Sequence, residues 1–152
     1  MPRGARRLPD ACVEELRAAD MIVHLGDFQT TQVLQELRDH GPVGAAVCGN
    51  VDSAELRHSL PERAMLEVEG ARIGLVHDAG PASGRLGRLR AQFPEASVVL
   101  FGHSHLPLHE SAAGFQIFNP GSPTERRRAP TRSMGLAHIR DGQVRLRHVS
   151  LR

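Results

Sequence analysis

Short apolar runs alternate with a segment of helical periodicity near the start of the chain. Residues 21–25 and 43–47 are short apolar runs that predict buried strands, and each is soon followed by a glycine and a polar residue. Between them, residues 30–40 place three apolar side chains on one helical face. This order predicts strand, loop, helix and strand, with a polar segment that continues to Pro61.

One more helix is predicted before these elements, and a hairpin after them. Leu8-Pro9-Asp10 precedes an amphipathic stretch that ends near Asp20, with Asp10 as the expected helix cap. Residues 64–68 and 72–76 flank a turn that contains a glycine, so they should pair antiparallel.

The second half of the chain predicts one helix, one buried strand and two hairpins. A helix with Leu86, Leu89 and Phe93 on one face ends at Pro94, and a strand over residues 98–101 follows. The hairpins pair residues 106–110 with 115–119 and residues 134–139 with 144–151. Because early strands alternate with helices and later strands form hairpins, we expect an α/β fold of two packed mixed β-sheets flanked by helices, in a single domain over residues 1–152.

Composition argues against several classes of protein. The 152-residue chain has a formal net charge of +2, and no apolar run approaches the roughly 20 residues of a membrane-spanning helix. Since no signal core follows the basic first residues, we expect a cytoplasmic protein without a membrane partner. Every basic residue is Arg, and Trp and Tyr are absent. Nucleic acid is not favoured as a partner, because neither a basic stripe nor aromatic stacking platforms stand out. Cys12 and Cys48 lack CxxC spacing and predict reduced, buried thiols.

Residues able to bind a metal ion follow four of the predicted strands. They are Asp27, Asn50, His77 and the pair His103 and His105. The carboxyl ends of strands in α/β folds meet where loops form one crevice, and residues two apart in an extended segment point the same way. One carboxylate, one amide oxygen and three imidazoles suit Mn, Fe, Zn or Ni better than calcium or a thiolate zinc site.

Each of these residues alone also has an ordinary structural explanation. Asp27 would serve equally as a helix cap or turn residue, and Asn50 after glycine is a common turn former. His77 would fit a core or surface position. The combination at four strand ends is what favours a metal site.

Five segments resemble, in this order, the calcineurin-like metallophosphoesterases and in particular the small YfcE-type phosphodiesterases. They are His24-Leu25-Gly26-Asp27-Phe28, Gly49-Asn50-Val51-Asp52, His77, Gly102-His103-Ser104-His105 and Asn119-Pro120-Gly121-Ser122. The resemblance implies that Asp27 bridges two divalent ions, with Mn favoured, that Asn50, His77 and His103 complete one site, and that His105 belongs to the other. It also implies that Asn50 contacts the substrate, a small phosphate ester hydrolysed by a hydroxide bridging the metals.

The chain departs from the family pattern in three places. No Asp-x-His motif precedes Asp27, so the second metal lacks two ligands and the domain lacks its first strand. We expect a misassigned start, a truncated chain or a real loss of activity. Val51 stands where larger relatives carry a histidine that protonates the leaving group, and Asp78 stands where glycine is common.

Two other functions stay open at this point. The same fold serves as a protein-interaction scaffold in the retromer subunit that resembles these enzymes, and a chain lacking two ligands suits that role. Nucleic-acid binding would rest on arginine content alone. The run Arg126-Arg127-Arg128 fits an anionic substrate or a solvated surface, and a homo-oligomer is compatible with the sequence.

Overall fold

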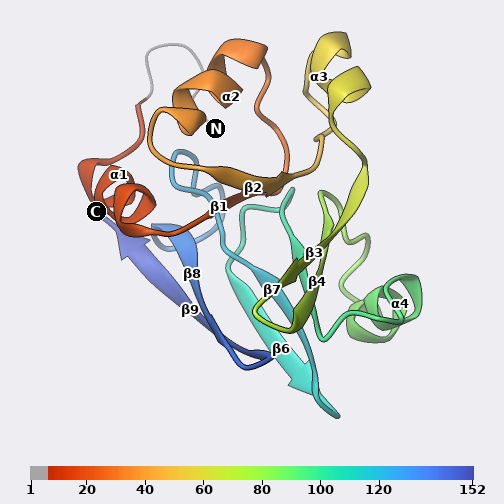
Figure 1. The fold of residues 1–152 in the computed structure, drawn as a ribbon. Helices are drawn as coiled ribbons and strands as arrows, with labels where there is room; N and C mark the ends of the chain where they lie inside the picture. Colours follow the sequence, from red (N-terminus) through yellow and green to blue (C-terminus); the bar gives the residue numbers. More distant parts are fainter. Residues whose placement is uncertain (1–6) are drawn as a thin grey trace.

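The computed structural model describes residues 7–152, and the expectations for the first residues concern positions 1–6, outside this part. Helices and strands alternate early and give way to hairpins later (Figure 1). The helices are α1 Asp10–Ala18, α2 Thr31–Arg38, α3 Ala54–Ser59 and α4 Arg85–Gln92. The strands are β1 Ile22–His24, β2 Val43–Ala46, β3 Arg63–Val68, β4 Ala71–Val76, β5 Val98–Phe101, β6 Leu108–Ala112, β7 Phe115–Asn119, β8 Arg132–Arg140 and β9 Gln143–Leu151.

Across residues 7–152 the strands form three hydrogen-bonded groups. β1 and β2 pair in parallel, β8 and β9 pair antiparallel, and a mixed five-stranded sheet has the order β3-β4-β5-β7-β6. Within this sheet β4, β5 and β7 are parallel, whereas the edge strands β3 and β6 run antiparallel to their neighbours. The parallel strands therefore all end at the same edge, where their loops can meet.

Successive residues of β5 show how the five-stranded sheet is covered on both faces. Val99 and Phe101 pack with Leu89 of α4. Val98 and Leu100 pack on the other side, with apolar residues from the β2 region and the β8–β9 hairpin. This alternation follows from the period of two along a strand. Figure 1 accordingly shows α4 on one side of the sheet and β8 and β9 on the other.

The remaining helices cover the second layer of strands. Ile22 of β1 packs with Leu37 of α2, Leu56 of α3 and the fully buried Phe28. Cys12 of α1 packs against the β8–β9 hairpin. The predicted α/β fold of two packed mixed β-sheets flanked by helices is thus confirmed, and its second layer consists of two separate strand pairs.

Three local predictions were wrong. Asp10 begins α1 instead of capping it, because Pro9 occupies the cap position. The segment before Pro61, described only as polar and given no helix, contains α3, whose Leu56 N–H donates to the capping Ser53 Oγ at 3.3 Å. β6 begins at Leu108 and not at residue 106, which fits the lack of a backbone N–H at Pro107.

Two structural findings concern the features expected from composition. Cys12 and Cys48 are free and buried. Burial raises the pKa of the Cys12 thiol to about 11 and also raises that of Cys48, so both favour the uncharged form. None of the helices among residues 7–152 is long and apolar enough to cross a membrane.

Candidate metal centre

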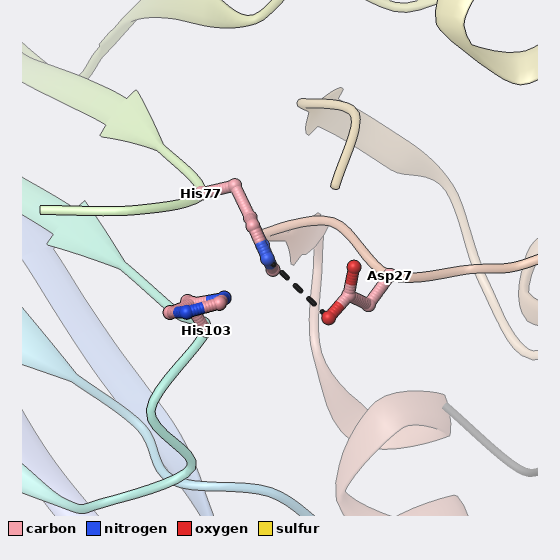
Figure 2. A group of neighbouring side chains, drawn as sticks. All are labelled: Asp27, His77 and His103. Carbon is pink, nitrogen blue, oxygen red and sulfur yellow. Dashed lines mark ion pairs between the residues drawn. The ribbon is translucent and has the colours of Figure 1, made fainter. Parts of the chain in front are cut away.

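Four of the side chains singled out in the sequence meet at the ends of β1, β2, β4 and β5. Asp27, His77 and His103 each offer a ligand atom, and these atoms all lie within 4.8 Å of one another. Figure 2 shows the three side chains converging from separate strands. Asn50 joins them, since its Oδ1 lies 2.9 Å from Nε2 of His77 and 3.2 Å from Nδ1 of His103.

The orientation of His77 is fixed by a main-chain contact on its far side. Nδ1 lies 2.6 Å from the carbonyl oxygen of Leu25, so Nδ1–H donates there. In the neutral ring this leaves a lone pair on Nε2, which faces Asn50 Oδ1 and lies 3.3 Å from Oδ2 of Asp27. Three acceptor atoms therefore face one another, an arrangement that a shared cation or proton stabilises.

The spacing of these atoms fits a metal ion. Donors bound to one ion at about 2.1 Å lie about 3.0 Å apart in an octahedral arrangement and about 3.4 Å apart in a tetrahedral one. The contacts of Asn50 with His77 at 2.9 Å and with His103 at 3.2 Å match these separations. The contact of His77 with Asp27 at 3.3 Å matches them as well. A carboxylate, an amide oxygen and imidazoles also suit Mn, Fe, Zn or Ni.

Electrostatics at the site favour a cation. Partial burial opposes a charge on Asp27, but its contact with His77 prevails and lowers the pKa of the carboxyl to about 2. Burial likewise opposes a charge on His77, but the contact with Asp27 prevails and raises the pKa of the imidazole. The carboxylate is thus charged at neutral pH, and a proton on His77 would compete with a metal.

Glycines let the ligand loops approach closely. A Cβ on Gly26, which has a φ of 98°, would lie 2.6 Å from Nδ1 of His77. A Cβ on Gly49 would overlap the backbone nitrogen and Oδ1 of Asp27. Asp27 and His103 themselves adopt positive φ angles of 60° and 63°. Strained backbone of this kind clusters at functional sites.

Asp52 ties two of the ligand loops together, a role that the sequence interpretation missed. Its side chain is almost fully buried, with 2% of its surface exposed. The N–H of Gln29 donates to its Oδ1 and the N–H of Gly49 donates to its Oδ2, each at 2.7 Å. The loops that carry Asp27 and Asn50 are therefore held by one carboxylate. Its place in the Gly-Asn-x-Asp segment was the available signal.

Asn119 holds the loop after β5 in place through hydrogen bonds of its side chain. It is fully buried, and its Nδ2 donates to the carbonyl oxygen of Gly102 at 2.8 Å and to Oγ of Ser104 at 3.1 Å. Its Oδ1 accepts from the N–H of Gly121 at 2.9 Å. The segment Asn119-Pro120-Gly121-Ser122, noted for its resemblance, thus positions the segment that carries His103.

His105 lies outside the group of converging side chains. Its Nδ1–H donates to the carbonyl oxygen of Glu125 at 3.0 Å, which leaves Nε2 as the nitrogen with a lone pair. Burial, followed by the charge of Arg127, lowers the pKa of His105. The ring is therefore a neutral imidazole that is able to bind a metal. Among the described residues, a second metal would have Asp27 and His105 as the expected ligands.

The positions that depart from the family pattern surround the site. Val51 contributes only its N–H, which donates to Oδ1 of Asp27 at 3.2 Å. The exposed Asp78 lies 4.0 Å from Nε2 of His103. Of the arginine run, Arg127 reaches the site and donates from Nη1 to the carbonyl oxygen of His103 at 2.9 Å.

Comparisons with known proteins agree with this arrangement. Residues 4–142 match the model of the calcineurin-like phosphoesterase superfamily domain. A probable metallophosphoesterase of Methanocaldococcus jannaschii is 33% identical over 140 residues, which cover 90% of this chain and 70% of that protein.

Solved structures show the same fold. The solution structure of Thermotoga maritima protein TM1076 has a TM-score of 0.72 and 31% identity, over 95% of this chain and 88% of that one. Vps29 of Entamoeba histolytica complexed with zinc has a TM-score of 0.77 and 20% identity, over 99% of this chain and 93% of that one. The chain belongs to the calcineurin-like phosphoesterase superfamily, and its curated relatives include probable metallophosphoesterases.

Proposed function

We propose that this protein is a phosphodiesterase that hydrolyses a small phosphate ester with two divalent metal ions, Mn being favoured. The observation that carries the proposal is the convergence of Asp27, Asn50, His77 and His103, whose neighbouring ligand atoms lie 2.9–3.3 Å apart in three contacts. His105 and the shared Asp27 are the proposed ligands of the second.

When bound, such ions supply Lewis acidity toward the phosphoryl oxygens and lower the pKa of the attacking water. The protein side chains position these components. Asp27 contributes a full negative charge, and the Leu25 carbonyl holds His77 with Nε2 toward the site. Asn50 is exposed and directs Oδ1 to the two histidines, which leaves its amide Nδ2 to donate to a phosphoryl oxygen.

The test is release of 4-nitrophenol from bis(4-nitrophenyl) phosphate with and without Mn²⁺. The proposal expects turnover that needs the metal and that Asp27→Ala and His103→Ala abolish. The exposed His138 of β8 gives a matched control. The substitution His138→Ala also removes one imidazole, but at a position that is not among the proposed metal ligands. Hydrolysis that is equal in chelator and in Mn²⁺ would contradict the proposal.

A protein-binding scaffold is the second candidate, because Vps29 structures share the fold over nearly the whole chain. Tight Mn²⁺ binding without hydrolysis of any phosphodiester would favour that role. The cytoplasmic location, the absence of a nucleic-acid partner and a homo-oligomeric state stay predictions from the sequence.

A further inference from the structure

A hollow of about 330 Å³ opens beside the ligand His103. It is lined by His103, Ser104, Leu106, Arg127 and Arg128. Leu106 is an unusually exposed apolar residue, with 40% of its surface accessible. The hollow is therefore lined by one proposed metal ligand, an exposed apolar side chain and two arginines.

The three consecutive arginines have different surroundings, although all are exposed. Arg126 donates from Nη1 to the carbonyl oxygen of Ala129 at 2.9 Å and so closes its own turn. Arg127 donates to the carbonyl oxygen of His103 at 2.9 Å and has a positive φ of 46°. The run is therefore not a uniformly solvated segment, because Arg127 is hydrogen-bonded to the main chain of the proposed ligand His103.

Within residues 7–152 neither arginine at the hollow, Arg127 or Arg128, forms an ion pair with an acidic side chain, although Asp78 lies 4.0 Å from Nε2 of His103 at the edge of the hollow. No carboxylate lines the hollow itself. A guanidinium presents several N–H donors in a planar fork that matches phosphate or carboxylate oxygens. Two such groups next to each other select for an anion.

We propose that Arg127 and Arg128 bind a second anionic group of the substrate, carried by the organic part of the phosphate ester. The inference rests on the proposed function, because it takes the scissile phosphate to lie at Asp27, Asn50, His77 and His103. The organic part then packs on Leu106, and its own phosphate or carboxylate reaches the two guanidinium groups. The substrate class is a phosphodiester with a further charged group.

Binding of thymidine 5′-phosphate and thymidine 3′,5′-bisphosphate to the Mn²⁺-loaded protein, measured by calorimetry, tests this inference. The bisphosphate should bind about tenfold more tightly, since a hydrogen bond to a charged group is worth about 1.5 kcal/mol or more. Arg127→Ala and Arg128→Ala should each reduce this ratio toward one, and Arg127→Lys should retain part of it. Arg126→Ala is the matched control for loss of one charge in the same loop and should leave the ratio unchanged.

A parallel assay uses thymidine 5′-(4-nitrophenyl phosphate) with and without a 3′-phosphate. Hydrolysis of both esters with equal kcat/KM, or a binding ratio of one, overturns the arginine site and leaves the proposed function standing. A binding preference that depends on Arg127 without hydrolysis of either ester supports the arginine site and contradicts the phosphodiesterase. A preference that both arginine variants retain also overturns the inference. Thermal unfolding of each variant shows whether a lost preference reflects a lost fold.

Discussion

Nε2 of His77 lies 3.3 Å from Oδ2 of Asp27, while Nδ1 of the same ring donates to the carbonyl oxygen of Leu25. One histidine therefore connects the end of β4 to the loop after β1 through both ring nitrogens. This contact sets the direction of the Nε2 lone pair, and it links the charge of Asp27 to the protonation of His77.

The coupling predicts that Mn²⁺ affinity rises with pH. The pKa of His77 is raised, so the metal-free protein holds a proton there to a higher pH than an ordinary histidine does. Binding must displace this proton, so affinity increases as the pH rises through the raised pKa. Calorimetry at pH 6 and pH 8, in buffers of different ionisation enthalpy, should show tighter binding and less proton release at pH 8. Affinity that falls over this range would contradict the role of His77.

Asp52 is expected to act on the metal site without touching the metal. Asp52→Asn replaces one buried acceptor oxygen with an N–H donor, so the N–H of either Gln29 or Gly49 loses its partner. We expect unfolding to become easier by about 1–3 kcal/mol, and Mn²⁺ affinity to fall about 10- to 100-fold, as for other groups that support metal ligands. Chemical denaturation and metal titration measure both. The exposed Asp141→Asn is the control, and an Asp52 variant that behaves like it would contradict this role.

Gly49 and Gly87 form a matched pair for testing close approach. A Cβ at Gly49 overlaps Asp27, so Gly49→Ala should lower both the free energy of unfolding and the affinity for Mn²⁺. A Cβ at Gly87 in α4 meets no atom within 4 Å. Gly87→Ala should therefore stabilise the protein by about 0.5–1 kcal/mol, the usual difference between the two residues in a helix. Equal effects of the two substitutions on metal affinity would contradict the tight packing of the ligand loops.

The burial of His24 should make the free energy of unfolding decrease as the pH falls below about 6.5. Burial lowers the pKa of its imidazole to about 3; the ring stacks on Phe28, and the N–H of Gly26 donates to its Nδ1. The imidazole of His24 takes up a proton near pH 6.5 in the unfolded chain but not in the folded chain. The neutral ring therefore contributes to the free energy of unfolding in full above pH 6.5, and this contribution is lost as the pH falls toward 3. The largest slope is about 1.4 kcal/mol per pH unit.

Urea unfolding between pH 4 and pH 7 measures this slope. His24→Gln should flatten the profile, because it removes the titrating group from both states. The exposed His138→Gln should leave the profile as in the parent chain. A parent slope that His24→Gln does not change would assign the acid sensitivity to other groups.

The sequence predicted the elements best where burial is strongest. β5, with its two alternating buried faces, was placed at residues 98–101 without error. α3 was missed because it has only six residues and buries only Leu56, so its pattern resembles a polar loop. Helix α1 was found, but its cap was not, since Pro9 excludes the expected role of Asp10.

The site could be predicted only in part for a different reason. Asp27, Asn50, His77 and His103 each stand where a strand ends, so the parallel topology brings them together. Asp52, Asn119 and Arg127 each bind a main-chain group that is distant in sequence. The separations are 23, 17 and 24 residues. Periodicity carries no information about such contacts, because they depend on the path of the loops.

The measurement that tests the central claim most directly is anomalous diffraction from crystals of the protein grown with Mn²⁺. The account predicts a peak bonded to Asp27, Asn50, His77 and His103 at about 2.0–2.3 Å, the usual range for such ligands. His77→Ala, crystallised in the same way, should weaken or abolish that peak. Well-ordered crystals with no peak between these four side chains, or with Mn²⁺ bound elsewhere, would contradict the assignment of this site.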